Sequence, residues 1–401
     1  MSTQDADEVR TFDQVVEPLG RETFFSEYWG RQFARIPGAH GRFTHLFPWE
    51  TLNEILENHR LDPRRIRLVR DAKNLDESLF LQNHTDWRIH PAGLYRELSN
   101  GATLIMDHVD DLEPRVRQLA ESFEEALKSR TAVNLYAGWR TDKGFDLHWD
   151  GQDTIILQVS GEKLWKVYRP TRLHPLKKEQ QEPPPPEEAP VWEGLLEAGD
   201  AIYLPRGWWH VAFPVDKPTL HLTVTTVPPS GADLLSWFVE NLKKYPEVRQ
   251  TIPYLGSKGE RVAYLQRLAE QFRELCVEDS FEQFISDWES EVLLRPRVAL
   301  PLGPIVTRDG LTTETRIRLA SAPRLSFKTS EDSSDSISFS GRGTFGECPA
   351  AVAPALKLLR GTNSCSVAEL SAVLHDEKAK SQLLIVLTAL LMRGIIQIDP
   401  S

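Results

Sequence analysis

Two kinds of hydrophobic periodicity divide the chain. From Thr131 to Pro228, apolar and polar residues alternate in short runs, a period of two that is typical of half-buried β-strands. Strands are predicted over 132–139, 153–159, 163–168, 201–204 and 219–226. Ser160-Gly161-Glu162 is a turn sequence between two of these strands and predicts a hairpin. Apolar residues before this region recur at helical spacing, for example between Arg115 and Lys128.

The pattern changes again after Pro228-Pro229. Apolar spacing near 3.6 predicts a helical module with helices over 233–244, 259–275 and 281–294. Short alternating segments near 316–319, 325–328 and 337–339 are expected to be strands. Helices are predicted over 352–360, after the capping box at Ser366–Glu369, and over 381–393, before a last strand at 395–398. Helices followed by a terminal strand suggest a winged-helix-like unit.

These changes predict an α+β fold in four parts. Residues 1–130 form a mixed α/β part, residues 131–228 a β-barrel core, residues 229–297 the helical module and residues 298–401 the winged-helix-like domain.

The charge of the chain narrows the possible partners. With 47 basic and 58 acidic residues, the net charge is −11, which argues against a general binder of nucleic-acid backbones. A basic partner such as a ribosomal protein is not excluded. The stretch 351–401 has five basic and four acidic residues, so the winged-helix-like unit is expected to pack or bind protein and not nucleic acid.

Cysteines and apolar runs indicate the compartment. Three cysteines without a CxxC pair predict neither a disulfide framework nor a zinc site, and they favour a reducing, cytoplasmic setting. The acidic, polar start is unlike a signal peptide, and no run of 18 apolar residues predicts a membrane span.

Three His-x-Asp tripeptides are candidates for metal ligands: His84–Asp86, His108–Asp110 and His148–Asp150. Only the third is followed by a predicted hairpin and then by a suitably placed histidine, His210. Two imidazoles and one carboxylate form the facial triad of non-haem iron oxygenases. The context therefore selects His148, Asp150 and His210.

His210 follows a tight bend. Gly199, Pro205, Gly207 and His210 match the spacing G-x5-P-x-G-x2-H of the second cupin motif. The last residue of that motif, an asparagine, is replaced by Pro214, so the match covers the ligand-bearing part.

These residues resemble the cupin-type JmjC ribosomal oxygenases. The similarity rests on His148-Trp149-Asp150, Gly161-Glu162-Lys163, Trp165 and Leu204-Pro205-Arg206-Gly207 before His210, and on the order of parts. The resemblance implies a double-stranded β-helix (the cupin or JmjC jelly-roll), with a helical dimerisation module and a winged-helix-like end. It also implies a homodimer that hydroxylates a ribosomal protein with Fe(II), 2-oxoglutarate and O2.

The resemblance also implies a role for individual residues. His148, Asp150 and His210 would hold Fe(II), and Lys163 with Thr223 would bind the far carboxylate of 2-oxoglutarate. Asn134, Tyr136 and Thr225 would contact the substrate side chain, and His221 would line the barrel. Histidine is the residue modified by some family members and arginine by others, and the sequence leaves this choice open.

Several alternatives remain open at this stage. Lys163 could be a solvated turn lysine, and Asn134 and Tyr136 could be ordinary polar lining of a strand. The alternating arginines of 64–70 could be a solvated strand face or a basic patch toward a substrate. The Pro/Glu-rich run 179–188 is expected to be an extended loop. A JmjC-type N-methyl demethylase and a non-catalytic cupin scaffold are the competing functions.

Overall fold

A computed structural model gives the structure of the chain. It describes residues 8–82, 87–140, 145–176, 179, 184–215, 217–291, 295, 298, 311–319, 326–329, 336–341, 344–362 and 364–399. The contacts divide the chain into two compact units, Met1–Pro228 and Pro229–Ser401.

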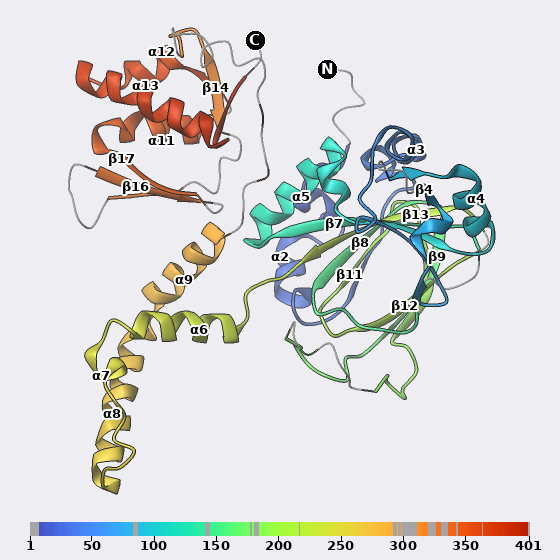
Figure 1. The fold of residues 1–401 in the computed structure, drawn as a ribbon, viewed down its shortest axis with the longest axis horizontal. Coiled ribbons are helices and arrows are strands. Elements are labelled where there is room, and N and C mark those ends of the chain that lie inside the picture. The colour runs from blue at the N-terminus through green and yellow to red at the C-terminus, as the bar shows by residue number, and fades with distance from the viewer. Residues whose placement is uncertain are drawn as a thin grey trace. The chain divides into compact units, whose positions relative to one another are not determined.

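Two antiparallel sheets form the first unit (Figure 1). The large sheet has the order β1-β11-β8-β13-β7-β6-β2-β3, and the small sheet has the order β10-β9-β12. The large sheet comprises β1 (Ala34–Ile36), β2 (Ile66–Arg70), β3 (Lys73–Asn74), β6 (Thr103–Met106), β7 (Thr131–Gly138), β8 (Asp153–Ser160), β11 (Ala201–Leu204) and β13 (Thr219–Thr226). The small sheet comprises β9 (Glu162–Tyr168), β10 (Trp192–Glu197) and β12 (Trp209–Pro214).

The predicted alternation sorts the side chains of these strands into two cores. Val133 and Leu135 of β7 and Ile155 of β8 belong to the main apolar core, which also includes residues of the helices on the outer face. Ile156, Trp165 and the residues packed with them form a second, smaller core. The predicted strands at 201–204 and 219–226 match β11 and β13 at both ends.

The hairpin between β8 and β9 depends on Gly161. Its φ is +67°, and a Cβ at this position would lie 2.2 Å from the carbonyl oxygen of Pro218. A glycine is therefore required by both conformation and space. The turn sets the register of β9, which places Lys163 beside Leu196 of β10 and Pro214 of β12.

Short helices and a small ribbon complete the first unit. They are α1 (Phe12–Val16), α2 (Arg21–Thr23), η1 (Phe24–Tyr28), η2 (Thr44–Leu46), α3 (Trp49–Asn58), η3 (Glu77–Leu79), β4 (Leu81–Gln82), β5 (Arg88–Ile89), α4 (Pro91–Ser99), η4 (Val109–Asp111) and α5 (Pro114–Leu127). The aromatic stripe near Phe24 forms a π-helical turn, η1. Phe24 packs against Tyr203 of β11 with ring centroids 5.1 Å apart.

The second unit begins with helices. These are α6 (Gly231–Leu242), α7 (Pro246–Arg249), α8 (Lys258–Leu275) and α9 (Glu278–Glu291). The predicted segments lie within a few residues of α6, α8 and α9.

Two three-stranded sheets and several helices follow. They include β14 (Arg316–Leu319), β15 (Ser326–Thr329), β16 (Ser336–Gly341), β17 (Thr344–Pro349), η7 (Ala350–Val352), α11 (Ala353–Gly361), β18 (Cys365–Ser366), α12 (Val367–Ala372), α13 (Glu377–Met392) and β19 (Ile396–Ile398). The predicted capping box is present, since Ser366 Oγ accepts from the Glu369 amide at 3.1 Å and Glu369 accepts from the Ser366 amide. Classifying this part as winged-helix-like remains a prediction, as do the domain limits at 130 and 297.

Within the described part of the chain, no helix combines the length and the apolar character needed to cross a membrane.

Candidate metal centre

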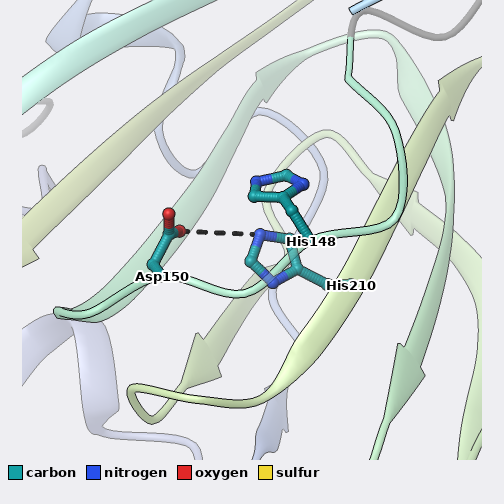
Figure 2. Close-up of side chains that lie close together, drawn as sticks. All are labelled: His148, Asp150 and His210. Atoms are coloured by element: carbon teal, nitrogen blue, oxygen red, sulfur yellow. Dashed lines mark ion pairs between the residues drawn. The ribbon is translucent and has the colours of Figure 1, made fainter. Parts of the chain in front are cut away.

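An antiparallel backbone bridge brings the two predicted histidine ligands together. The His210 amide donates to the His148 carbonyl at 2.8 Å, and the His148 amide donates back at 3.2 Å. Asp150 lies two residues after His148, and its Oδ2 is 3.6 Å from His210 Nε2 (Figure 2). One ligand atom from each of these residues lies within 4.8 Å of the others. The spacing allows all three to bind one ion.

Hydrogen bonds to backbone carbonyls orient both imidazoles. His148 Nδ1 lies 2.8 Å from the Asp146 carbonyl, and His210 Nδ1 lies 3.0 Å from the Trp208 carbonyl. A carbonyl only accepts, so each Nδ1 carries the proton and each Nε2 keeps a free lone pair. Burial, with a smaller contribution from His148, lowers the pKa of His210 to about 4. The imidazole of His210 is therefore neutral at neutral pH, as a metal ligand must be.

Asp153 connects the two segments that carry the ligands. Its Oδ1 accepts from the Arg206 amide at 3.0 Å, and its Oδ2 accepts from Tyr203 Oη at 2.7 Å. The Gly207 amide, with φ +86°, donates to the Asp150 carbonyl at 2.9 Å. The predicted bend before His210 is thus tied directly to the segment that bears His148 and Asp150.

A cavity of about 270 Å³ opens beside the three ligands. Its lining includes Lys163 and Trp165 of β9, Tyr136 of β7 and Thr223 of β13. The Lys163 side chain is buried, and burial lowers its pKa to about 7. Among the described residues, no carboxylate lies within ion-pair distance of its ammonium group. The cavity therefore contains a buried amine that is about half protonated at neutral pH and is available to pair with an anionic ligand.

One of the three predicted substrate residues is among the described residues that line the cavity. Tyr136 lines the cavity, and its ring stacks on His221 at a centroid distance of 4.9 Å. Asn134 and Thr225 are not among the described lining residues. Asn134 Oδ1 accepts from the His108 amide at 3.0 Å, and Thr225 Oγ1 donates to the Ala132 carbonyl at 3.2 Å. Asn134 thus binds the backbone at His108, and Thr225 binds the backbone of the neighbouring strand β7.

Arg67 and Trp165 also line the cavity, although the sequence had given neither a site role. The indole of Trp165 lies 6.0 Å from the imidazole of His210, roughly parallel to it. Arg67 lies on β2, within the basic run whose two interpretations were left open. Each of three arginines in that run, Arg65, Arg67 and Arg70, forms an ion pair. Only contacts between distant segments could have shown which of them reaches the cavity.

The other His-x-Asp tripeptides do not form a second centre within the described residues. His84–Asp86 lies outside those residues. His108 adopts a left-handed backbone conformation with φ +56°, and Asp110 Oδ1 accepts from the Val133 amide at 2.9 Å. The carboxylate of Asp110 therefore stabilises β7.

Comparison with known proteins agrees with this geometry. A JmjC domain model matches residues 107–234, a range that contains all three ligands. The chain is 25% identical over 219 residues to the bifunctional lysine-specific demethylase and histidyl-hydroxylase NO66 of Drosophila persimilis. It is 29% identical over 225 residues to the protein of that name from Caenorhabditis elegans, and 27% identical over 227 residues to ribosomal oxygenase 1 of Bos taurus. Residues 107–234 thus match a JmjC domain, and the chain is similar to proteins named ribosomal oxygenase.

Sequence similarity to the relatives covers about half of the chain or more. Each of these three alignments covers 54% of the chain and about a third of the relative, namely 31%, 30% and 33%. Structural similarity covers more of the chain than these sequence alignments do. The ribosomal oxygenase YcfD from Escherichia coli aligns with a TM-score of 0.57 at 17% identity, over 95% of this chain and 98% of that one. YcfD is also known in complex with cobalt and 2-oxoglutarate, and that structure gives a TM-score of 0.57 at 18% identity.

Proposed function

We propose that this JmjC protein is an Fe(II)- and 2-oxoglutarate-dependent oxygenase that hydroxylates a side chain of a ribosomal protein. The observation that carries the proposal is the joint presence of an oriented His-Asp-His triad and an unpaired buried ammonium in one cavity. The triad would suit a metal that binds the 2-oxo acid end of 2-oxoglutarate. The ammonium would suit the carboxylate at the other end. YcfD, which has a similar fold, was solved in complex with cobalt and 2-oxoglutarate, and this supports a metal and 2-oxoglutarate as the ligands of the cavity.

The donor set fits ferrous iron. Two neutral imidazoles and one carboxylate, with no thiolate among the described lining residues, suit Fe(II) and leave coordination positions open. Bound iron would supply the activation of O2. His148, Asp150 and His210 would hold the metal, and the carbonyls of Asp146 and Trp208 would fix the two rings by accepting their Nδ1 protons.

Lys163 would bind the far carboxylate of 2-oxoglutarate. A buried ammonium is costly without a counter-charge, and a bound carboxylate restores the pair. Thr223, on β13, lines the same cavity and would add a hydroxyl donor. The overall reaction is balanced: one O2 is used, one oxygen atom enters the substrate C–H bond, and the other enters succinate as CO2 leaves.

Tyr136, supported by Asn134, would contact the substrate side chain, and Thr225 would lie further along the same face. The relatives named ribosomal oxygenase support a ribosomal protein as substrate, and the acidic charge of the chain suits such a basic partner. Histidine is favoured over arginine as the modified residue by the relatives whose name includes histidyl-hydroxylase.

Demethylation is the second candidate, because the same relatives are also named lysine-specific demethylases. Hydroxylation of an N-methyl group is followed by loss of formaldehyde, so both activities use the same centre. A non-catalytic scaffold has less support, since the triad and Lys163 are both in place.

We also propose that the helical module forms a homodimer. Between α6 and α9, few large apolar side chains are buried, namely Phe238, Tyr264 and Phe284. Many more are exposed: Leu235, Val239, Ile252, Tyr254, Leu255, Val262, Leu265, Val277 and Phe281. An apolar surface of this kind is typical of a protein interface.

The direct test of the activity is incubation of the Fe(II)-loaded chain with 2-oxoglutarate, O2 and a ribosomal protein preparation. Mass spectrometry should show the gain of one oxygen on a single residue, with succinate formed in equal amount. Loss of a methyl group in place of oxygen gain would favour demethylation. Absence of both, with no succinate formed, would contradict an oxygenase.

The pKa of Lys163 predicts how co-substrate affinity depends on pH. The free protein has a pKa of about 7 at this position, and the carboxylate binds the protonated form. Affinity should be nearly constant below pH 7 and should fall above it, by up to about tenfold per pH unit, because binding must then take up a proton. Lys163→Met should weaken binding roughly ten- to hundredfold and remove this dependence. Calorimetry with Mn(II) in place of iron measures both effects.

Lys166→Met is the matched control for that experiment. Lys166 lies on the same strand, and its ammonium pairs with Glu193 at 3.0 Å. The affinity and its pH profile should stay as in the unmutated protein. An equal loss of 2-oxoglutarate affinity in both variants would contradict the role assigned to Lys163.

The dimer predicts a solution mass of two chains by light scattering. Leu265→Asp places a charge on the exposed apolar face of α8 and should shift the mass toward one chain, whereas the neighbouring exposed position Gln266→Asp should not. A mass of one chain for the unmutated protein at micromolar concentration would contradict the proposal.

A further inference from the structure

Arg67 gives the cavity a second cationic group, far along the chain from Lys163. Its Nη2 lies 3.0 Å from both carboxylate oxygens of Asp107. The pair is partly shielded, with side-chain exposures of 34% and 21%. The Asp107 amide donates to the Arg65 carbonyl at 2.8 Å, which anchors Asp107 just after β6. Arg67 is thereby held in the cavity wall, and both oxygens of the nearby carboxylate are engaged.

Tyr136, in the same wall, is oriented as a hydrogen-bond donor. A backbone amide can only donate, so the contact of the His108 amide with Asn134 Oδ1 identifies the amide oxygen of Asn134. The NH2 group of Asn134 is left for its hydrogen bond with Tyr136, which acts to lower the pKa of the phenol. Tyr136 Oη is therefore the acceptor in that bond. Burial raises the pKa of Tyr136 overall, so the phenol keeps its proton and can donate it to a ligand.

The wall formed by Arg67 and Tyr136 thus offers donors and a positive charge. Asp150 is the carboxylate among the described lining residues, and it belongs to the metal triad. A guanidinium and a methylated ammonium carry a positive charge and have no hydrogen-bond acceptor. Either group would meet the positive end of the Arg67–Asp107 pair, because Arg67 lines the cavity and Asp107 is not among the described lining residues. A neutral imidazole has one acceptor nitrogen and fits the donors.

We propose that Arg67, held by Asp107, is a specificity-determining residue that excludes cationic side chains from the cavity. The enzyme then hydroxylates a neutral side chain that bears an acceptor, such as histidine, and oxidises neither arginine nor N-methyl-lysine. This inference rests on the proposed oxygenase function. It predicts that this chain lacks the lysine-specific demethylase activity that appears in the name of its relatives.

The test uses the full Fe(II)-loaded chain and four peptide libraries. Each library has randomised flanks and one fixed central residue: histidine, arginine, lysine or N-methyl-lysine. Oxygen gain or methyl loss at the central residue is measured by mass spectrometry, and succinate is measured in parallel. The unmutated chain should modify the histidine library and leave the three cationic libraries unchanged.

Arg67→Gln removes the positive charge and frees the Asp107 carboxylate. Turnover of the arginine or N-methyl-lysine library should rise at least about tenfold relative to the histidine library, because like-charge repulsion is replaced by attraction. Arg67→Lys retains the charge and should retain the exclusion, which provides a check if Arg67→Gln folds poorly. Arg70→Gln is the matched control, since Arg70 lies on the same strand and pairs with Glu97 at 3.1 Å. The Arg70→Gln variant should show the same preference among the four libraries as the unmutated chain.

The outcomes separate this inference from the function on which it rests. Turnover of a cationic library by the unmutated chain, at a rate equal to or above that of the histidine library, would overturn the role of Arg67. An unchanged preference in folded Arg67→Gln would do the same. Succinate formation without modification of any library would overturn the assignment of a neutral acceptor side chain. Absence of succinate in every reaction would instead reject the oxygenase function itself.

Discussion

The backbone bridge between His148 and His210 is the constraint on which the site depends. These residues are distant in sequence, and the two hydrogen bonds between them fix how close their rings can be. Asp153 reinforces the bridge, since it binds the Arg206 amide and Tyr203 Oη on either side of the bend. Because the scaffold supplies this geometry, the ligands can be in place before a metal binds, and little conformational entropy is lost on binding.

The electrostatics of the cavity follow from the charged side chains that the strands place in its wall. Lys163 and Arg67 are both directed into a space whose described lining has one carboxylate, Asp150. Such a cavity favours anions, and 2-oxoglutarate would satisfy Lys163. Asp107 pairs with Arg67 but is not among the described lining residues, so the positive end of this pair lines the cavity. Both proposals, binding of 2-oxoglutarate at Lys163 and selection of the substrate at Arg67, rest on this distribution of charge.

Local patterns in the sequence predicted the strands and the three candidate metal ligands, which the fold brings together. Period-two alternation located β13, the turn at Gly199-Asp200 and the bend at Pro205 bounded β11, and the Gly161 turn with the bend at Gly207 placed Lys163 and His210. Residues Phe24–Tyr28 form a π-helical turn, not an α-helix, and this turn packs on Tyr203. A propensity for helix does not distinguish these two helical geometries.

The role of Arg67 lay beyond prediction from local pattern. Its partner Asp107 is 40 positions away, and alternation alone could not show which arginine of the strand faces the cavity. The substrate residues show the same limit. Tyr136 lines the cavity, but Asn134 is turned toward the His108 amide by a contact across 26 positions. Pairings of this kind depend on tertiary structure.

The most direct measurement of the central claim is an anaerobic titration with Fe(II) and 2-oxoglutarate, followed by visible absorption. The account predicts a metal-to-ligand charge-transfer band in the unmutated chain and in His108→Ala, where the histidine of an unused His-x-Asp tripeptide is removed. The band should be absent in His148→Ala. Its absence from the unmutated chain, or its persistence in His148→Ala, would contradict an iron centre at these residues.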